Sequence, residues 1–206
     1  MDGEGISVSG DASMKPLRPL VMIQSRTASA RLPGKALLPI AGYPVAVLAA
    51  KRASNTGLDV KVLTTSDESD EILYQILFNH AVPVFRGDPS NVLRRFVDAL
   101  EGEPENRLLF RLTADNVLPD GWLLDQMLKT YSSSNCDILR CSAAVRGVPV
   151  GVSAELTTVA QIREALLHCE DDYDREHVTP WIYRNRKVDE FTSADIIVSK
   201  DLRVTI

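Results

Sequence analysis

Residues 20–35 read LVMIQSRTASARLPGK, and this stretch indicates both the fold class and the site. Its first four residues are apolar without interruption, which is typical of a strand buried on both faces of a parallel sheet. The cations Arg26, Arg31 and Lys35 then follow in quick succession. Arginine and lysine neutralise phosphate charge, Gly34 allows close backbone approach, and turn amides can hold an anion. We therefore predict a polyphosphate-binding loop directly after the first strand.

Two common nucleotide-binding motifs differ from this loop. A Walker P-loop needs Gly-x4-Gly-Lys followed by Ser or Thr, whereas here Ser29 stands in the first position and Ala36 follows the lysine. The dinucleotide fingerprint Gly-x-Gly-x-x-Gly is also absent from the sequence. A solvated loop with incidental cations is the alternative, but an Arg-x4-Arg-x3-Lys spacing directly after a strand favours phosphate.

The composition suits one cytoplasmic α/β domain. A chain of 206 residues with 45% hydrophobic residues can bury a single sizeable core. Its net charge of −5 argues against a nucleic-acid partner. Three cysteines without metal-ligand spacing indicate reduced thiols. We find no run near the roughly 18 apolar residues of a membrane span and no signal peptide, so we expect no membrane partner.

Strand and helix patterns alternate along residues 17–206, which we expect to form one domain after a disordered tail at residues 1–16. Apolar runs predict strands at residues 20–23, 58–64, 82–85, 107–112 and 136–141. Helical spacing of apolar residues predicts helices around residues 72–77, 92–100, 123–128 and 158–166. This alternation predicts a three-layer α/β fold, a mostly parallel sheet with helices on both faces. Ligands then bind outside the carboxyl ends of the strands, where the cationic loop lies.

A carboxylate, Asp115, follows the predicted strand at residues 107–112 on the same edge as the cationic loop. Magnesium prefers one or two carboxylates together with substrate phosphates. A turn or helix-capping aspartate is the alternative, and the neighbouring phosphate loop favours the metal. We therefore predict Mg²⁺ as the cofactor and Asp115 as its ligand.

The loop resembles a family signature. Residues 26–35 match Arg-x-x-Ser-x-Arg-Leu-Pro-Gly-Lys of the sugar-acid cytidylyltransferases, which include CMP-Kdo synthetases and, closest, spore-coat polysaccharide cytidylyltransferases. The likeness extends from residue 20 to the end of the chain. It implies a Rossmann-like nucleotidyltransferase fold of the GT-A type. It also implies Mg²⁺-dependent transfer of CMP from CTP to a sugar acid, with release of pyrophosphate, in surface polysaccharide biosynthesis.

The resemblance also implies a nucleotide site. Arg31 and Lys35 would offset charge on the pyrophosphate, and Asp115 would complete the catalytic set. Ser66 and Asp67 could instead cap a helix, and Arg86 could be a surface residue at a turn. The residues expected to bind nucleotide are Gln24, Ser25, Arg26, Ser29, Arg31, Lys35, Ser66, Asp67, Arg86, Arg95, Arg111 and Thr113.

The acceptor side departs from the family pattern. The family's Gly-Leu-Asp-Val-Glu is here residues 151–155, GVSAE, where Ser153 replaces an aspartate. The resemblance implies that Gly151, Ser153, Glu155 and His177 face the acceptor, although His177 could equally be a structural histidine. Ser153 keeps open a phosphonate or phosphate-ester acceptor.

The family's second metal ligand is an aspartate directly after a strand like residues 202–206, LRVTI, where this sequence stops. Either the native chain continues or the metal is held differently. A non-catalytic nucleotide-binding domain of a longer enzyme is therefore a further alternative. We expect CTP and an acidic acceptor as small-molecule partners, and a homodimer.

Overall fold

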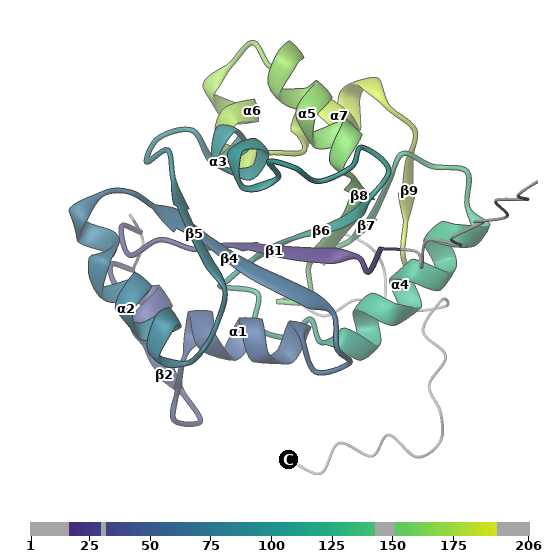
Figure 1. The fold of residues 1–206 in the computed structure, drawn as a ribbon. Helices are drawn as coiled ribbons and strands as arrows, with labels where there is room; N and C mark the ends of the chain where they lie inside the picture. Colours follow the sequence, from purple (N-terminus) through teal and green to yellow (C-terminus); the bar gives the residue numbers. More distant parts are fainter. Residues whose placement is uncertain (1–16, 30–31, 143–150, 193–206) are drawn as a thin grey trace, which may run out of the picture.

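The computed structural model describes residues 17–29, 32–142 and 151–192. Within these residues a seven-stranded sheet has the order β5-β4-β1-β6-β8-β7-β9 (Figure 1). The strands are β1 (Leu20–Gln24), β4 (Asp59–Thr65), β5 (Val84–Gly87), β6 (Leu108–Thr113), β7 (Ile138–Cys141), β8 (Ala154–Thr158) and β9 (Val188–Glu190). Strand β8 pairs antiparallel with β6 and β7, and the other strand pairs of this sheet are parallel.

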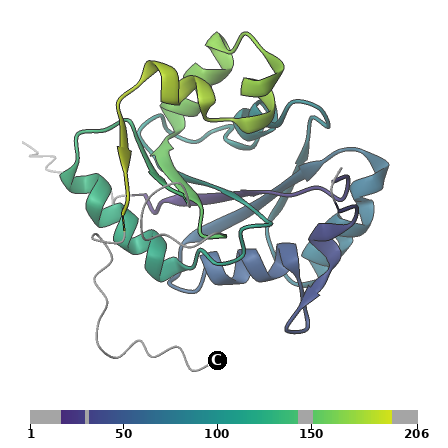
Figure 2. The ribbon, with the colours of Figure 1, turned by 180° about the vertical axis from the view of Figure 1, so that it is seen from behind.

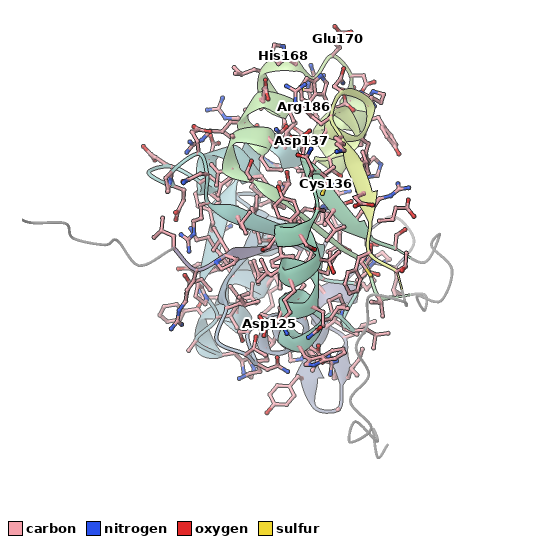
Figure 3. All side chains as sticks on the ribbon, turned by 90° about the vertical axis from the view of Figure 1, so that its right-hand side faces the viewer. Asp125, Cys136, Asp137, His168, Glu170 and Arg186 are labelled. Carbon is pink, nitrogen blue, oxygen red and sulfur yellow. The ribbon has the colours of Figure 1, made fainter. Side chains whose placement is uncertain are left out.

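Helices cover both faces of the sheet, which confirms the predicted three-layer fold. One face carries α1 (Val45–Ala53), α2 (Glu71–Asn79) and α4 (Gly121–Ser133). The other carries α3 (Val92–Ala99), α5 (Val159–His168), α6 (Asp172–His177) and α7 (Pro180–Asn185), as the view from behind also shows (Figure 2). Seen from the side, Asp125 on α4 and His168 at the end of α5 lie on opposite sides of the sheet (Figure 3).

Strand β1 explains the uninterrupted apolar run of the sequence. It lies between β4 and β6, so both of its edges are hydrogen-bonded. Val21 and Ile23 pack into the core under α1, α2 and α4, whereas Leu20 and Met22 pack toward α3 and α5. None of the four is more than 4% exposed. A strand buried on both faces has no position for a polar side chain.

Several elements were not predicted from the sequence. These are α1, α6, α7, β8, β9, the hairpin β2–β3 (Pro39–Ile40 and Tyr43–Pro44) and the short 3-10 helices η1 (Lys35–Leu37) and η2 (Glu68–Asp70). The two predicted strands at 82–85 and 136–141 begin two residues too early. The amide of Val82 bonds to Leu77 O at the end of α2, and Ser134 and Cys136 form a turn before β7.

Side chains cap the first turns of α4 and α5. Asp120 accepts a hydrogen bond from the amide of Leu123, and Thr158 accepts one from the amide of Gln161. The second half of the capping box at Thr158 is not formed, because Gln161 Oε1 has no partner among the described residues. No helix in the described part of the chain is long and apolar enough to cross a bilayer.

Gly121, the first residue of α4, is packed too tightly for a side chain. A Cβ there would lie 2.3 Å from Thr56 Oγ1 and 2.8 Å from the backbone nitrogen of Thr56. We expect Gly121→Ala to lower the free energy of unfolding by about 1–3 kcal/mol, because the turn after α1 must move. Urea denaturation would measure this, with the exposed Lys129→Ala on the same helix as control. Equal midpoints for the two variants would contradict this packing.

Candidate active site

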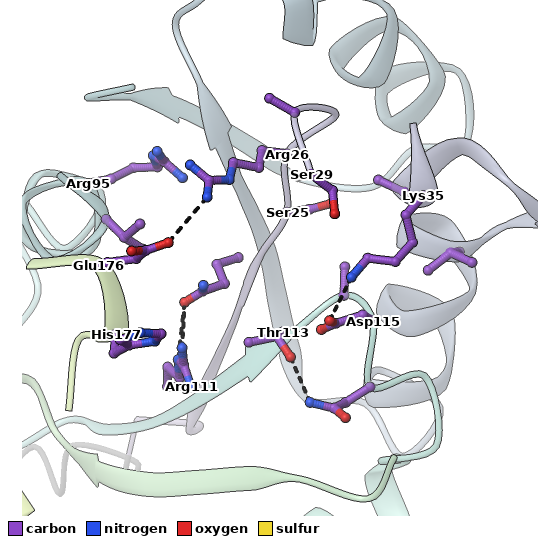
Figure 4. A pocket seen from close by; sticks show the side chains of 17 residues that line it. Ser25, Arg26, Ser29, Lys35, Arg95, Arg111, Thr113, Asp115, Glu176 and His177 are labelled. Atoms are coloured by element: carbon purple, nitrogen blue, oxygen red, sulfur yellow. Dashed lines mark hydrogen bonds and ion pairs between the residues drawn. The ribbon is translucent and has the colours of Figure 1, made fainter. Parts of the chain in front are cut away.

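A pocket of about 450 Å³ opens at the carboxyl ends of β1 and β6. Most of the residues expected at the site come together here (Figure 4). The expected residues that line it are Gln24, Ser25, Arg26, Ser29, Lys35, Arg95, Arg111, Thr113, Asp115 and His177. Arg31 lies outside the described residues. The predicted position at the carboxyl edge of the sheet is therefore where the pocket lies.

Lys35 and Asp115 form an ion pair at one end of the pocket. Lys35 begins η1 directly after Gly34, whose φ of 70° ends the loop in a left-handed turn. Its Nζ lies 2.8 Å from Asp115 Oδ2, and both side chains are partly exposed. Burial alone would raise the pKa of Asp115, but hydrogen bonds from Lys35 and Thr113 hold it below its ordinary value. The carboxylate is therefore charged and already paired with a cation.

The opposite end of the pocket is also cationic (Figure 4). Arg26 pairs with Glu176 at 3.3 Å. Arg95 is only 1% exposed, and its guanidinium donates to the backbone oxygens of Asp88 and Pro89. It forms no ion pair with any described residue, and burial lowers its pKa. A buried guanidinium without a carboxylate in contact makes this end attractive to an anion.

Gly87 makes room for the buried arginine. A Cβ at this position would lie 2.9 Å from Cγ of Arg95 and 2.8 Å from Cε1 of Phe85. The aliphatic stem of Arg95 therefore passes directly over the end of β5. The predicted nucleotide role of Arg95 remains untested.

Arg111 and Glu155 form a connected polar network beside the pocket. Arg111 donates to Gln24 Oε1 through Nε and Nη2, at 3.1 and 2.8 Å, and its Nη1 lies 3.3 Å from Glu155 Oε2. Glu155 also accepts hydrogen bonds from the hydroxyls of Thr179 and Tyr183, and burial raises the pKa of Tyr183. Glu155 thus stands behind Arg111 and is not among the residues lining the pocket.

Three residues at or beside the pocket were not predicted from the sequence: Glu176, Thr179 and Tyr183. All three belong to the stretch that begins at Arg175 and continues into α7, of which only His177 was predicted as a site residue. Hydroxyl and carboxylate side chains flanking a predicted site histidine are the signal that could have drawn attention to them.

Three residues predicted to bind nucleotide lie outside the pocket lining. Arg86 donates to the backbone oxygens of Thr65 and Asp67 and pairs with Glu71. Asp67 caps η2 by accepting from the amide of Ser69, as its capping alternative predicted. The amide of Ser66 donates to Gly87 O. These residues join the ends of β4 and β5.

Two residues predicted to face the acceptor, Gly151 and Ser153, also lie outside the lining. Both precede β8, and Gly151 has a φ of 91° that suits glycine. His177 does line the pocket, at the end of α6, where its ring centroid lies 4.3 Å from that of Tyr173. The acceptor roles of all these residues stay predictions.

One buried polar atom in the pocket lining has no partner. Ser25 is 7% exposed, and its Oγ makes no hydrogen bond within the described residues. A buried hydroxyl usually pairs with protein, water or a ligand. Ser25 directly follows β1, so its hydroxyl is available to a molecule bound beside the loop.

Two carboxylates line the pocket, Asp115 beside Lys35 and Glu176 beside Arg26 at the opposite end. No group of three or more His, Cys, Asp or Glu side chains that could hold a metal occurs in the described part of the chain. Asp115 alone suits a Mg²⁺ ion that takes its remaining ligands from substrate phosphates and water.

Comparisons with known proteins point to one family. A model of the cytidylyltransferase family matches residues 20–196. An uncharacterized protein of Methanocaldococcus jannaschii is 29% identical over 90% of this chain and 76% of its own length. The spore coat polysaccharide biosynthesis protein SpsF of Bacillus subtilis is 31% identical over 79% of this chain and 69% of its own length.

A solved structure agrees with these relatives. The cytidylyltransferase of Leptospira borgpetersenii superposes with a TM-score of 0.76 at 28% identity, over 85% of this chain and 76% of that one. The family model spans the sheet, both helical layers and the residues of the pocket. The chain therefore belongs to the cytidylyltransferase family.

Proposed function

We propose that this chain transfers CMP from CTP to an oxygen of an acidic sugar acceptor, with release of pyrophosphate, in surface polysaccharide biosynthesis. The observation that carries the proposal is the pocket, in which the cationic loop and Asp115 meet at the carboxyl edge of the sheet. Membership of the cytidylyltransferase family supplies the nucleotide. The spore coat relative supports the polysaccharide pathway.

The proposed reaction needs no nucleophile from the protein. An acceptor oxygen attacks the α-phosphorus of CTP in line, and the bond from that phosphorus to the pyrophosphate oxygen breaks. Charge then builds on the departing pyrophosphate. Lys35, and Arg31 on the same loop, would offset that charge, because a fixed cation stabilises developing negative charge without reorganisation. The remaining contribution is to hold acceptor and nucleotide in line.

Mg²⁺ fits the residues present. Asp115 is charged, and its only charged neighbour among the described residues is Lys35 at 2.8 Å. We propose that Asp115 holds the ion when CTP brings its phosphates, while Lys35 turns toward the pyrophosphate. When bound, the ion would neutralise phosphate charge and polarise the phosphoryl oxygens.

The acidic acceptor is supported by the second cationic end of the pocket. Arg26, Arg95 and His177 surround it, and Glu176 already pairs with Arg26. An acceptor carboxylate could take the place of Glu176 on Arg26. A phosphonate or phosphate ester would satisfy the same cations, so the acceptor assay must include all three chemistries. The expected cytoplasmic location and homodimer stay predictions, and light scattering after gel filtration would test the second.

The nucleotide preference is the first test. We expect CTP to raise the melting temperature of the protein more than ATP, GTP or UTP do. Pyrophosphate release should then require CTP together with a sugar acid, a phosphonate or a phosphate ester. An equal melting shift with all four nucleotides would contradict the cytidine assignment. CTP binding without pyrophosphate release from any acceptor would favour a non-catalytic domain.

The role of Lys35 predicts a loss of rate without a loss of fold. Lys35→Ala should reduce turnover by ~10²–10³-fold, as removal of one preorganised charge-stabilising donor typically does. Its side chain is 32% exposed, so the midpoint of urea denaturation should change little. The exposed Lys129→Ala is the matched control and should keep full turnover. A fully active Lys35→Ala protein would refute the assigned role.

The role of Asp115 predicts a change in metal dependence. Asp115→Asn keeps the shape of the side chain and removes the charge that a hard cation prefers. We expect turnover to fall at least ~10²-fold and the Mg²⁺ concentration for half-maximal rate to rise. Titration of activity with MgCl₂ would measure both, with Asp125→Asn on α4 as control. An unchanged Mg²⁺ dependence would assign the ion to another carboxylate.

A further inference from the structure

Asp70 is a buried carboxylate that lies just outside the pocket. It ends η2 and is 1% exposed. Its Oδ1 accepts from the amide and the hydroxyl of Thr27 at 2.7 and 2.5 Å. Its Oδ2 accepts from the hydroxyls of Thr64 and Thr65 at 2.8 and 2.6 Å, and from the amide of Thr65 at 3.1 Å. Five donors thus converge on one carboxylate that does not line the pocket.

This carboxylate is compensated without an ion pair. No described cation lies within salt-bridge distance of Asp70, and each of its donors is an amide or a hydroxyl. Burial alone would raise the pKa of Asp70, but the hydrogen bonds from Thr27, Thr65 and Thr64 hold it below its ordinary value. An ionised carboxylate only accepts hydrogen bonds, which matches a shell made of donors alone.

Thr27 connects Asp70 to the cationic loop. The neighbours of Thr27 on both sides, Arg26 and Ala28, line the pocket, whereas Thr27 turns away to Asp70. The backbone oxygen of Thr27 accepts a hydrogen bond of 2.9 Å from the amide of Gly34. Thr27 at the beginning of the loop is therefore joined to Gly34 at its end, and Gly34 directly precedes Lys35. A displacement of Thr27 would shift both Arg26 and Lys35.

The stretch from Thr64 to Asp67 completes the anchor. Thr64 and Thr65 supply three of the five donors to Asp70. Asp67 accepts from the amide of Ser69 and so fixes the single turn that presents Asp70. Thr27 Oγ1 also lies 2.9 Å from Ser69 O. This stretch was predicted to approach the nucleotide, and the contacts give it a second use, as the support of Asp70.

We propose that Asp70 is the positioning residue that holds the two described ends of the cationic loop, at Thr27 and Gly34, in place for nucleotide binding. The inference rests on the proposed function, since it takes this loop as the CTP site. Ordering a loop costs conformational free energy, and an anchor made before binding removes that cost from the binding step. Asp70 thus acts through Thr27 and makes no contact with substrate.

The anchor can be measured without nucleotide. We expect Asp70→Asn to accelerate hydrogen exchange at the amide of Gly34 by ~10-fold or more. The NH₂ group of Asn is itself a donor and would face the donors that now bind Asp70, so Thr27 and its hydrogen bond to Gly34 should loosen. NMR exchange on the ligand-free protein would resolve this amide. Amides of β1, such as that of Met22, should keep wild-type rates and so report an intact fold. Wild-type exchange at Gly34 in a folded Asp70→Asn protein would overturn the inference.

Two milder variants separate positioning from general stability. Thr27→Val and Thr64→Val each remove one hydroxyl donor from Asp70, the first from the loop and the second from the sheet. We expect Thr27→Val to raise KM for CTP by ~5–10-fold, within the range of one lost hydrogen bond, with a smaller change in kcat. Thr64→Val, which changes the sheet side of the anchor, should leave KM within ~2-fold of the wild-type value. Thr27→Ser should restore wild-type KM. Equal KM effects of the two valine variants would reduce Asp70 to a structural role.

The two proposals can fail separately. Absence of CTP binding by the wild-type protein would overturn the proposed function, while the exchange measurement on Gly34 would still decide whether Asp70 anchors the loop. Normal CTP binding with unchanged KM in Thr27→Val and Asp70→Asn would overturn the anchor alone.

Discussion

The double burial of β1 is the constraint on which the arrangement of the site depends. The first four residues of β1 are hydrogen-bonded on both edges, packed on both faces and apolar, so no charged side chain stands within this run. Polar residues can appear only where the strand ends. The two neighbouring parallel strands end at the same edge, and their following residues meet there. Strand β1 therefore contributes its polar side chains only at this edge, and the ion-paired Arg111 of β6 and Glu155 of β8 lie beside it.

Two ion pairs show how distant segments share this edge. Lys35 and Asp115 come from the loop after β1 and the turn after β6, and Arg26 and Glu176 come from that loop and from α6. Each pair places a cation against a carboxylate at one end of the pocket. An anionic substrate would compete with these carboxylates for the cations. Each displaced carboxylate would then need water or another cation as its partner.

The parts of the fold and site that could be predicted are those set by local pattern and strand direction. The apolar run at residues 20–23 predicts a buried strand, and the loop with Lys35 follows it. Asp115 follows a second predicted strand, so both residues are expected at the same edge of the sheet. Helix α1 was not predicted because its sequence, VAVLAAKRA, has too few polar residues to give a helical period. Strand β8 was not predicted because its local sequence does not indicate an antiparallel partner. The contacts of Arg86 and the place of Glu155 behind Arg111 depend on residues far along the chain, whereas Arg95 is held by the nearby backbone oxygens of residues 88 and 89. Such contacts follow from packing and are not encoded in spacing.

The position of β8 in the sheet has a consequence for how the chain reaches its folded state. Strand β6 pairs on one edge with β1, which precedes it, and on the other with β8, which is made only after α4 and β7. During synthesis the β8-facing edge of β6 therefore waits unpaired while roughly 40 further residues emerge, a matter of seconds at ribosomal rates. An open strand edge is a template for pairing with other chains. The antiparallel insertion thus makes the nascent protein vulnerable to aggregation at β6, the strand that Asp115 follows, and gives chaperones a defined interval in which they can act.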